Sequence, residues 1–149
     1  MHNFETHYIM KVNKHVIGLN LKDMTHEESL VVPPTGGNSV NWILGHIIVS
    51  RNGIAELLGI EKRFSDDTLT GLYDRGTQNI PADKAFKLEK LLDIYNDSQS
   101  VLEEKIAATD LSNDHEKLKN LTFLAFHEAY HVGQTGLLRR ISGKKGAIK

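Results

Sequence analysis

Eight of the 149 residues are histidines, and two of these form the motif His127-Glu-Ala-Tyr-His131. On an α-helix, residues four apart lie about 40° apart around the axis and one turn apart along it, so both imidazoles can point at one cation. The chain contains no cysteine, so only nitrogen and oxygen atoms are available as protein ligands to a metal. The spacing fits a metal site, and it fits equally a pair of histidines packed in the core.

The same five residues match the H-E-x-x-H signature of zinc proteases, in which the glutamate acts as general base. Such proteases need a third protein ligand, usually downstream, yet residues 132–149 contain no His, Asp, Glu or Cys. The chain also lacks a strand pattern along which a peptide substrate could lie. A zinc protease is therefore disfavoured.

A third ligand can come from upstream, and His46 in Asn41-Trp-Ile-Leu-Gly-His46 is the best placed. On its predicted helix it lies on the flank of the apolar face, so its ring can also point inward. Three protein ligands leave a coordination position for water or substrate, as in catalytic metal sites. The sequence therefore predicts a divalent-metal site formed by His46, His127 and His131. Three imidazoles accept nickel, zinc, copper or iron, so the pattern does not select the metal.

Further residues near these histidines are candidates for a role. Glu128 lies about 100° around the helix from the first histidine of the pair, either at the rim of the site as a proton carrier or simply in solvent. Gln134 can donate to a bound ligand or to the backbone, or it can pack as a polar residue on the inner face. These two are the candidate catalytic residues. His15 either reaches the site from the first helix or packs in the core, and Trp42 either walls the site or belongs to the core.

The elements that must position these side chains are predicted to be helices. Apolar residues recur every three or four positions over residues 4–19, 40–60, 82–108 and 115–141, and no segment alternates as a strand would. The expected buried faces include Phe4, Tyr8 and Val12 in the first helix and Phe123 and Tyr130 in the last. Residues 31–37, with paired prolines and paired glycines, and residues 61–80 are predicted to be loops.

Amphipathic helices without strands indicate an all-α fold, a four-helix bundle forming one domain over residues 1–149. The short link at residues 110–113 predicts that the third and fourth helices are antiparallel neighbours. The long segment 61–80 can cross the whole bundle. We therefore expect up-down-down-up connectivity.

Composition excludes several classes of function. The formal net charge is -1 and the pI is near 6.7, so nucleic acid is not an expected partner. No apolar run approaches the roughly 20 residues that cross a bilayer, and the first residues lack a signal-peptide pattern, so we expect a cytoplasmic protein without membrane association. A basic run near the end can attract an anionic substrate or merely complement the C-terminus of the last helix. Its members are Arg139, Arg140, Lys144, Lys145 and Lys149.

Three segments together resemble the DinB/YfiT-like family of metalloenzymes: Asn41-Trp-Ile-Leu-Gly-His46, Phe126-His-Glu-Ala-Tyr-His-Val-Gly-Gln134 and Gly136-Leu-Leu-Arg-Arg140. The resemblance covers nearly the whole chain. It implies a four-helix bundle with a three-histidine site that usually binds nickel or zinc, and the ligands would be His46, His127 and His131. Gly133 and Gln134 match the family's Gly-Gln continuation of the last helix. Activities in the family include thiol S-transfer with bacillithiol or mycothiol, maleylpyruvate isomerisation and hydrolysis.

The motifs and the resemblance predict a metal-dependent enzyme that acts on a small molecule. It would be a thiol S-transferase with a low-molecular-weight thiol as co-substrate, or a hydrolase. Transfer is slightly favoured, since the absence of cysteine is compatible with an external thiol.

The size of the chain and the family's habit predict a homodimer, with apolar residues left over on the first or third helix. The alternative is a non-catalytic metal-binding bundle that serves as a stress-response binding module.

Overall fold

The computed structural model describes residues 3–77 and 80–148, and every regular element in this part of the chain is a helix. The predicted all-α class is therefore confirmed. Within these residues the long helices are α1 (Phe4–Leu21), α3 (Val40–Leu57), α5 (Leu88–Ala108) and α6 (His115–Ile141), and the short ones are α2 (His26–Ser29) and α4 (Asp67–Tyr73). None of the described helices combines the length and the apolar character needed to cross a membrane.

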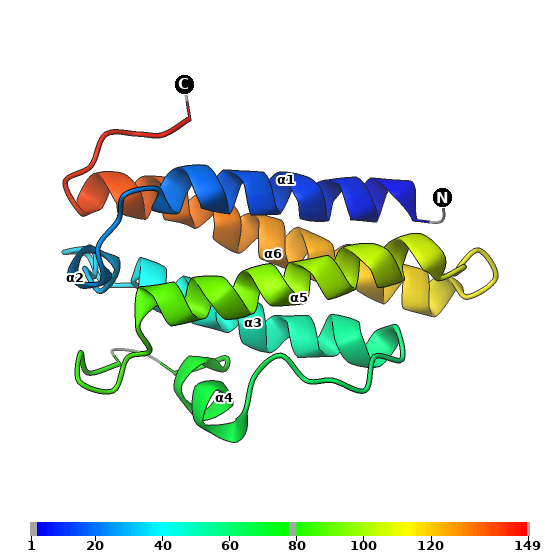
Figure 1. The fold of residues 1–149 in the computed structure, drawn as a ribbon. Helices are drawn as coiled ribbons and strands as arrows, with labels where there is room; N and C mark the ends of the chain where they lie inside the picture. The colour runs from blue at the N-terminus through cyan, green and yellow to red at the C-terminus, as the bar shows by residue number, and fades with distance from the viewer. Residues whose placement is uncertain (1–2, 78–79, 149) are drawn as a thin grey trace.

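The long helices lie alongside one another, with α1 and α6 running in one direction and α3 and α5 in the other (Figure 1). Each of α1 and α3 packs against both α5 and α6. No Cα atom of α5 comes within 8 Å of one of α6, so these two helices lie diagonally and the predicted neighbour relation is wrong. The link between them covers the end of the core with the buried Leu111. Residues 109–114 can span up to about 20 Å when extended, so a short link does not require adjacent helices.

Helix boundaries follow the capping residues. Ser39 accepts the Trp42 N–H and starts α3, and α6 has both of its predicted ends. In contrast, α5 begins at Leu88 rather than at residue 82. The reason lies in the backbone of Phe86, whose N–H donates to the Tyr73 hydroxyl and whose carbonyl accepts from the Asn41 amide. Tertiary hydrogen bonds therefore hold this residue outside the helix.

The segment 61–80 is not entirely a loop, because it contains α4. The Asp66 carboxylate accepts the Leu69 N–H at 2.8 Å and caps this helix. A capping box between Thr25 and Glu28 starts α2 in the same manner. Helices this short contain too few residues to show a periodicity, so their capping residues are the sequence feature that indicates them. α4 packs against α3 and covers part of its surface.

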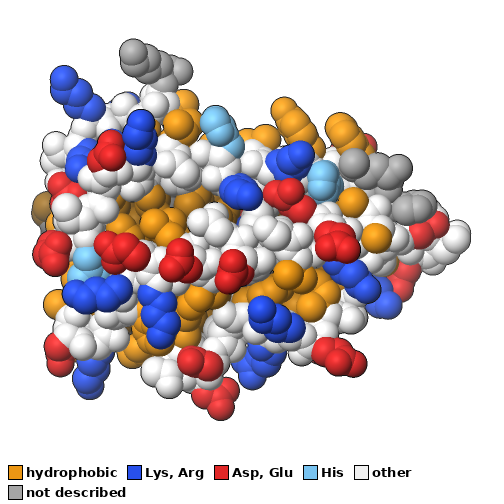
Figure 2. Space-filling model, in the orientation of Figure 1, with side chains coloured by type: hydrophobic (Ala, Val, Ile, Leu, Met, Phe, Trp, Pro, Cys, Tyr) orange, Lys and Arg blue, Asp and Glu red, His pale blue; other side chains and the backbone are white. Residues whose placement is uncertain are grey.

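The buried face of α1 is not the predicted one. Phe4, Tyr8 and Val12 are all exposed, and Figure 2 shows hydrophobic side chains over the N-terminal half of this helix. The buried face carries Thr6, Met10, Asn13, Ile17, Asn20 and Leu21. Its polar residues are compatible with burial where the neighbouring helix offers a partner. The Asn20 amide, for example, donates to the Thr135 hydroxyl of α6 at 2.9 Å.

The aromatic residues of α6 also face outward, contrary to expectation. Phe123 and Tyr130 are 61% and 58% exposed. The face that α6 turns inward is lined mainly by smaller or branched residues, namely Leu121, Ala125, Val132, Thr135 and Leu138. Such residues let α1 and α3 approach the helix closely. Among the described residues of the long helices, large exposed hydrophobic side chains therefore belong to α1 and α6, and not to α5.

Candidate metal centre

His46, His127 and His131 lie together where α3 packs against α6. Each offers one ring nitrogen, and these three atoms all lie within 4.8 Å of one another. The Nε2 atoms of His127 and His131 are 3.2 Å apart. Two nitrogens bound at about 2.0–2.1 Å to one tetrahedral ion lie about 3.3 Å apart, so this pair is already spaced for a common ion. The three histidines could therefore bind a metal ion.

His46 is positioned by a close contact between α3 and α4. A Cβ atom at the preceding residue, Gly45, would overlap the ring of Tyr73. Because glycine leaves that space free, the end of α4 reaches His46, whose Nδ1 lies 2.9 Å from the Tyr73 carbonyl oxygen. A carbonyl oxygen only accepts, so Nδ1 carries the proton and Nε2 keeps its lone pair. This bond orients the ring as the outer hydrogen bonds of metal-binding histidines do.

Trp42 fulfils both of its expected roles. It is buried, and its ring stacks on His46 with a centroid distance of 4.6 Å and an angle of 13° between the planes. Its indole N–H donates to the Thr77 hydroxyl at 2.9 Å. One face of the cavity beside the histidines is also formed by Trp42. The tryptophan thus holds the His46 ring in place while it contacts the cavity.

Gln134 orients His131. Its Oε1 lies 2.8 Å from His131 Nδ1, so Nδ1 donates and Nε2 is left with the free lone pair. Gln134 does not line the cavity, so it supports the potential metal ligand His131 and is not placed to contact a substrate. The same tautomer therefore results at His46 and at His131, and in each case a protein oxygen selects it.

Burial keeps the histidine pair on α6 uncharged. Desolvation lowers the pKa of His131 to about 4. Desolvation also lowers the pKa of His127, and the nearby His46 and Arg75 act in the same direction. At neutral pH both rings are therefore neutral imidazoles, and each keeps one nitrogen lone pair for a cation.

Glu128 lies neither at the rim of the cavity nor in solvent, so both expected placements are wrong. Its side chain is 3% exposed and forms a bidentate ion pair with Arg51 of α3. The two N–O distances are 2.8 Å from Nη2 and 2.9 Å from Nε. Both carboxylate oxygens are thereby engaged in charge-assisted hydrogen bonds, and Glu128 does not line the cavity.

Arg51 is a residue that the sequence interpretation missed. It is completely buried, and besides Glu128 it donates to the Tyr95 carbonyl, the Ser98 hydroxyl and the Gln99 side chain. Burial alone would lower the pKa of its guanidinium, but the charge and hydrogen bonds of Glu128 together with the contribution of Tyr95 outweigh this and raise the pKa. The sequence does contain a signal, since Arg51 shares the helix face of Ile47 and Ile54. A charge at a core position requires a buried partner.

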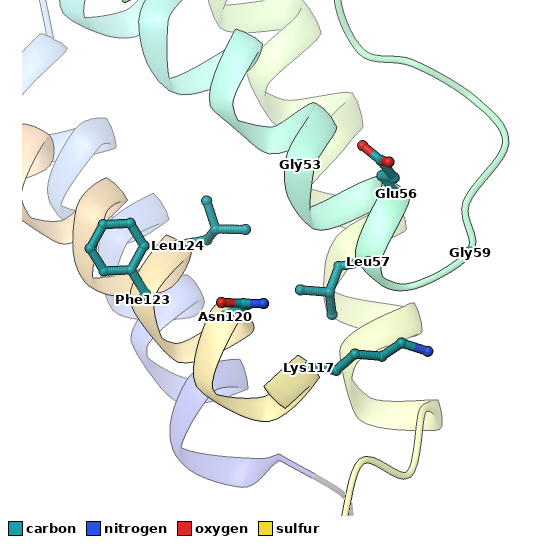
Figure 3. Close-up of a pocket in the computed structure, with 8 residues that line it drawn as sticks. All are labelled: Gly53, Glu56, Leu57, Gly59, Lys117, Asn120, Phe123 and Leu124. Atoms are coloured by element: carbon teal, nitrogen blue, oxygen red, sulfur yellow. The ribbon is translucent and has the colours of Figure 1, made fainter. Parts of the chain in front are cut away.

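A cavity of about 530 Å³ opens beside the three histidines. Trp42, Phe123 and Tyr130 contribute aromatic surface to it, and Asp74 and Arg75 contribute charges. A second hollow of about 600 Å³ adjoins it along the groove between α3 and α6 (Figure 3). The two share the side chains of Phe123 and Leu124. The histidines therefore face a space large enough for a small organic molecule.

The remaining candidates do not reach this cavity. His15 is exposed on α1, so neither of its expected placements is found. Arg139 donates to the carbonyl oxygens of Asn20 and Lys22 at the end of α1, and Lys144 pairs with Glu28 at 3.2 Å. These contacts agree with a structural role for the basic run. Lys149 lies outside the described residues.

No protein-family model matches this chain, and searches of curated proteins and of solved structures give no significant match. The resemblance to the DinB/YfiT-like family thus rests on the three sequence segments alone.

Proposed function

We propose that this protein is a metal-dependent enzyme of the DinB/YfiT-like type, a four-helix bundle that binds a divalent ion through His46, His127 and His131. One observation carries the proposal. Three imidazole nitrogens from two helices lie within 4.8 Å of one another beside a cavity of about 530 Å³. Two of these rings are already held in the tautomer that leaves Nε2 free.

An enzyme needs an open coordination position, and the ligand set supports one. Within residues 3–77 and 80–148, no Asp, Glu or Cys joins the three histidines as a fourth ligand. A bound nickel or zinc ion would act as a Lewis acid and lower the pKa of a coordinated water or thiol. The protein's own part is to hold the imidazoles in one orientation and to keep bulk water from the inner side of the site.

Transfer of an external thiol to an electrophilic small molecule is favoured over hydrolysis. The protein has no cysteine of its own, so a low-molecular-weight thiol would enter as co-substrate. Proteolysis is disfavoured further by the position of Glu128. In an H-E-x-x-H protease the glutamate must reach the attacking water, whereas here both of its oxygens are bound by Arg51.

Metal binding is tested by elemental analysis after the protein has been stripped with a chelator and reloaded with nickel or zinc. We expect about one ion per chain for the wild type. His127→Ala should lose the ion, and His15→Ala, which changes an exposed histidine on α1, should retain it. Unchanged stoichiometry and affinity in His127→Ala would refute the ligand assignment.

Catalysis is tested by a screen of thiol-transfer and hydrolysis reactions on the metal-loaded protein. His46→Ala should abolish turnover, while circular dichroism shows that the helices persist. Glu128→Gln, compared at a temperature where it is folded, should retain most of the activity. Peptide cleavage that disappears with Glu128→Gln would restore the protease interpretation.

The second candidate is a non-catalytic bundle in which the histidines bind a structural ion. A fourth protein ligand in the metal-loaded protein, together with no turnover across the screen, would favour it.

For either candidate we propose a homodimer, supported by the exposed apolar side chains on α1 and α6. Light scattering at several concentrations measures the molar mass in solution, and a constant mass near 16.7 kDa, that of one chain, would count against the dimer.

A further inference from the structure

The charged groups around the cavity favour a negatively charged ligand. The cavity opens beside His46, His127 and His131. Glu128, the acidic residue nearest to them in sequence, is neutralised by Arg51 and does not line the cavity. The charged residues that do line it are Asp74 and Arg75. With a divalent ion on the histidines, the sum of these charges is clearly positive.

Arg75 is the group most able to bind an anion there. It is exposed on the turn that follows α4, and it lines the cavity beside the histidines. The carboxylate of Asp74 accepts the backbone N–H of Arg75 at 2.7 Å, so one of its oxygens is engaged with the turn. The planar guanidinium can donate two parallel hydrogen bonds to a carboxylate or phosphate.

The rest of the cavity is suited to an apolar body. Phe123 and Tyr130 are each more than half exposed at its wall, and Trp42 lies inside it. Aromatic surface left open beside a concave site is stabilised when a ligand covers it. Beyond Phe123 and Leu124 the groove continues into the hollow of Figure 3, where Leu57 and Asn120 point into the space between the two helices. A ligand longer than a single ring therefore has room.

We propose that this cavity binds a small organic anion with an aromatic or other apolar body, whose carboxylate-like group is bound by Arg75 while its body contacts Trp42, Phe123 and Tyr130. This inference rests on the proposed function, since the metal ion supplies part of the positive charge.

The test uses zinc-loaded protein and three probes: phenylacetate, the neutral phenylacetamide and the ring-free acetate. Trp42 is the one tryptophan of the chain and lines the cavity, so its fluorescence reports occupancy, and calorimetry gives an independent affinity. We expect phenylacetate to bind about 10-fold more tightly than either of the others. Arg75→Gln should remove most of the preference for phenylacetate over phenylacetamide. Arg63→Gln, which changes another exposed arginine away from this cavity, should leave the preference unchanged.

The metal content of each sample is measured in parallel, so that the two proposals fail separately. Zinc-loaded protein that binds phenylacetamide as tightly as phenylacetate, that binds neither, or that responds equally to the two arginine substitutions would overturn the anion site and keep the metal site. Protein that takes up no metal yet shows an Arg75-dependent preference for phenylacetate would support the anion site and overturn the proposed function.

Discussion

Two polar clusters lie between α3 and α6, and they are constructed in opposite ways. In one, Arg51 and Glu128 are 0% and 3% exposed, and each is bound by its partner. In the other, protein oxygens hold the Nδ1 atoms of His46 and His131, while the Nε2 atoms of His127 and His131 face each other at 3.2 Å beside the cavity. His127 and Glu128 are consecutive residues, so the two clusters meet on adjacent positions of one helix.

The difference separates stability from chemistry. A fully paired ion pair has no capacity left for a ligand, and breaking it leaves an uncompensated buried charge. Uncharged imidazoles beside a cavity cost little to bury and retain their capacity to bind a cation. We therefore expect changes in the first cluster to reduce the stability of the fold, and changes in the second to reduce ligand binding.

The largest effect is expected from breaking the ion pair. Arg51→Ala or Glu128→Ala should lower the free energy of unfolding by about 3–5 kcal/mol, because either change leaves a buried charge without its partner. Denaturant unfolding followed by circular dichroism measures this. Lys117→Ala, which removes the exposed pair with Asp114, is the control and should cost at most about 0.5 kcal/mol. If the three variants unfolded at the same midpoint, the contrast between buried and exposed pairs would be lost.

Removing a histidine should reduce the stabilisation by zinc and leave the stability of the metal-free protein nearly unchanged. At a zinc concentration of about 100 times the dissociation constant, the wild type should gain about 2.7 kcal/mol of stability. His127→Ala should gain almost none, yet its metal-free stability should stay close to that of the wild type because this ring is only half-buried. Thermal unfolding with zinc and with a chelator compares the two. A zinc-dependent gain that survives in His127→Ala would place the metal elsewhere.

Gly45 tests how α4 supports the second cluster. Gly45→Ala should lower the free energy of unfolding by about 1–3 kcal/mol, because the added methyl group forces Tyr73 away. It should also weaken metal binding, because His46 loses its hydrogen bond to the Tyr73 carbonyl. The matched control is Gly133→Ala on α6, where an added Cβ atom meets nothing within 4 Å. That variant should be neutral or slightly more stable. Equal stability of the two variants would show that the contact of α4 with α3 is not tight.

Gln134→Ala should have a narrower effect. Without the amide oxygen, His131 is free to rotate and to change tautomer, so metal affinity should fall about 10-fold. Stability without metal should hardly change, since the side chain is only partly buried. Competition with a metal-sensitive dye measures the affinity. An unchanged affinity would mean that packing alone orients His131.

The smallest effect is a dependence of stability on pH in the metal-free protein. The unfolded chain protonates a histidine near pH 6.5, whereas burial lowers the pKa of His131 to about 4 in the folded state. The unfolded state therefore binds more protons between these values, and stability falls as the pH is lowered from about 6.5 to 4. Urea unfolding at about pH 7 and pH 5 should show a larger loss for the wild type than for His131→Asn. If the wild type and His131→Asn lost the same free energy of unfolding, His131 would not be the cause of the pH dependence.

Much of the site could be predicted because helical spacing is a local property. His127 and His131 are four residues apart on one helix, so their common direction follows from the sequence. The inward position of His46 follows from the apolar residues around it. The partner of Glu128 could not be derived in this way, since Arg51 lies on another helix. The available signal was the charge of Arg51 on the apolar face of its helix.

The helical class, the ends of α6 and the spacing of the histidine pair were determined by the sequence itself, because period, caps and glycine act within a few residues. The buried face of α1, the diagonal placement of α5 and α6, and the pairing of Glu128 with Arg51 were decided by tertiary structure. The physical reason is the same in each case. Periodicity says which side chains share a face of their own helix, but which face is buried depends on the shape and the hydrogen-bonding groups of the helices packed against it.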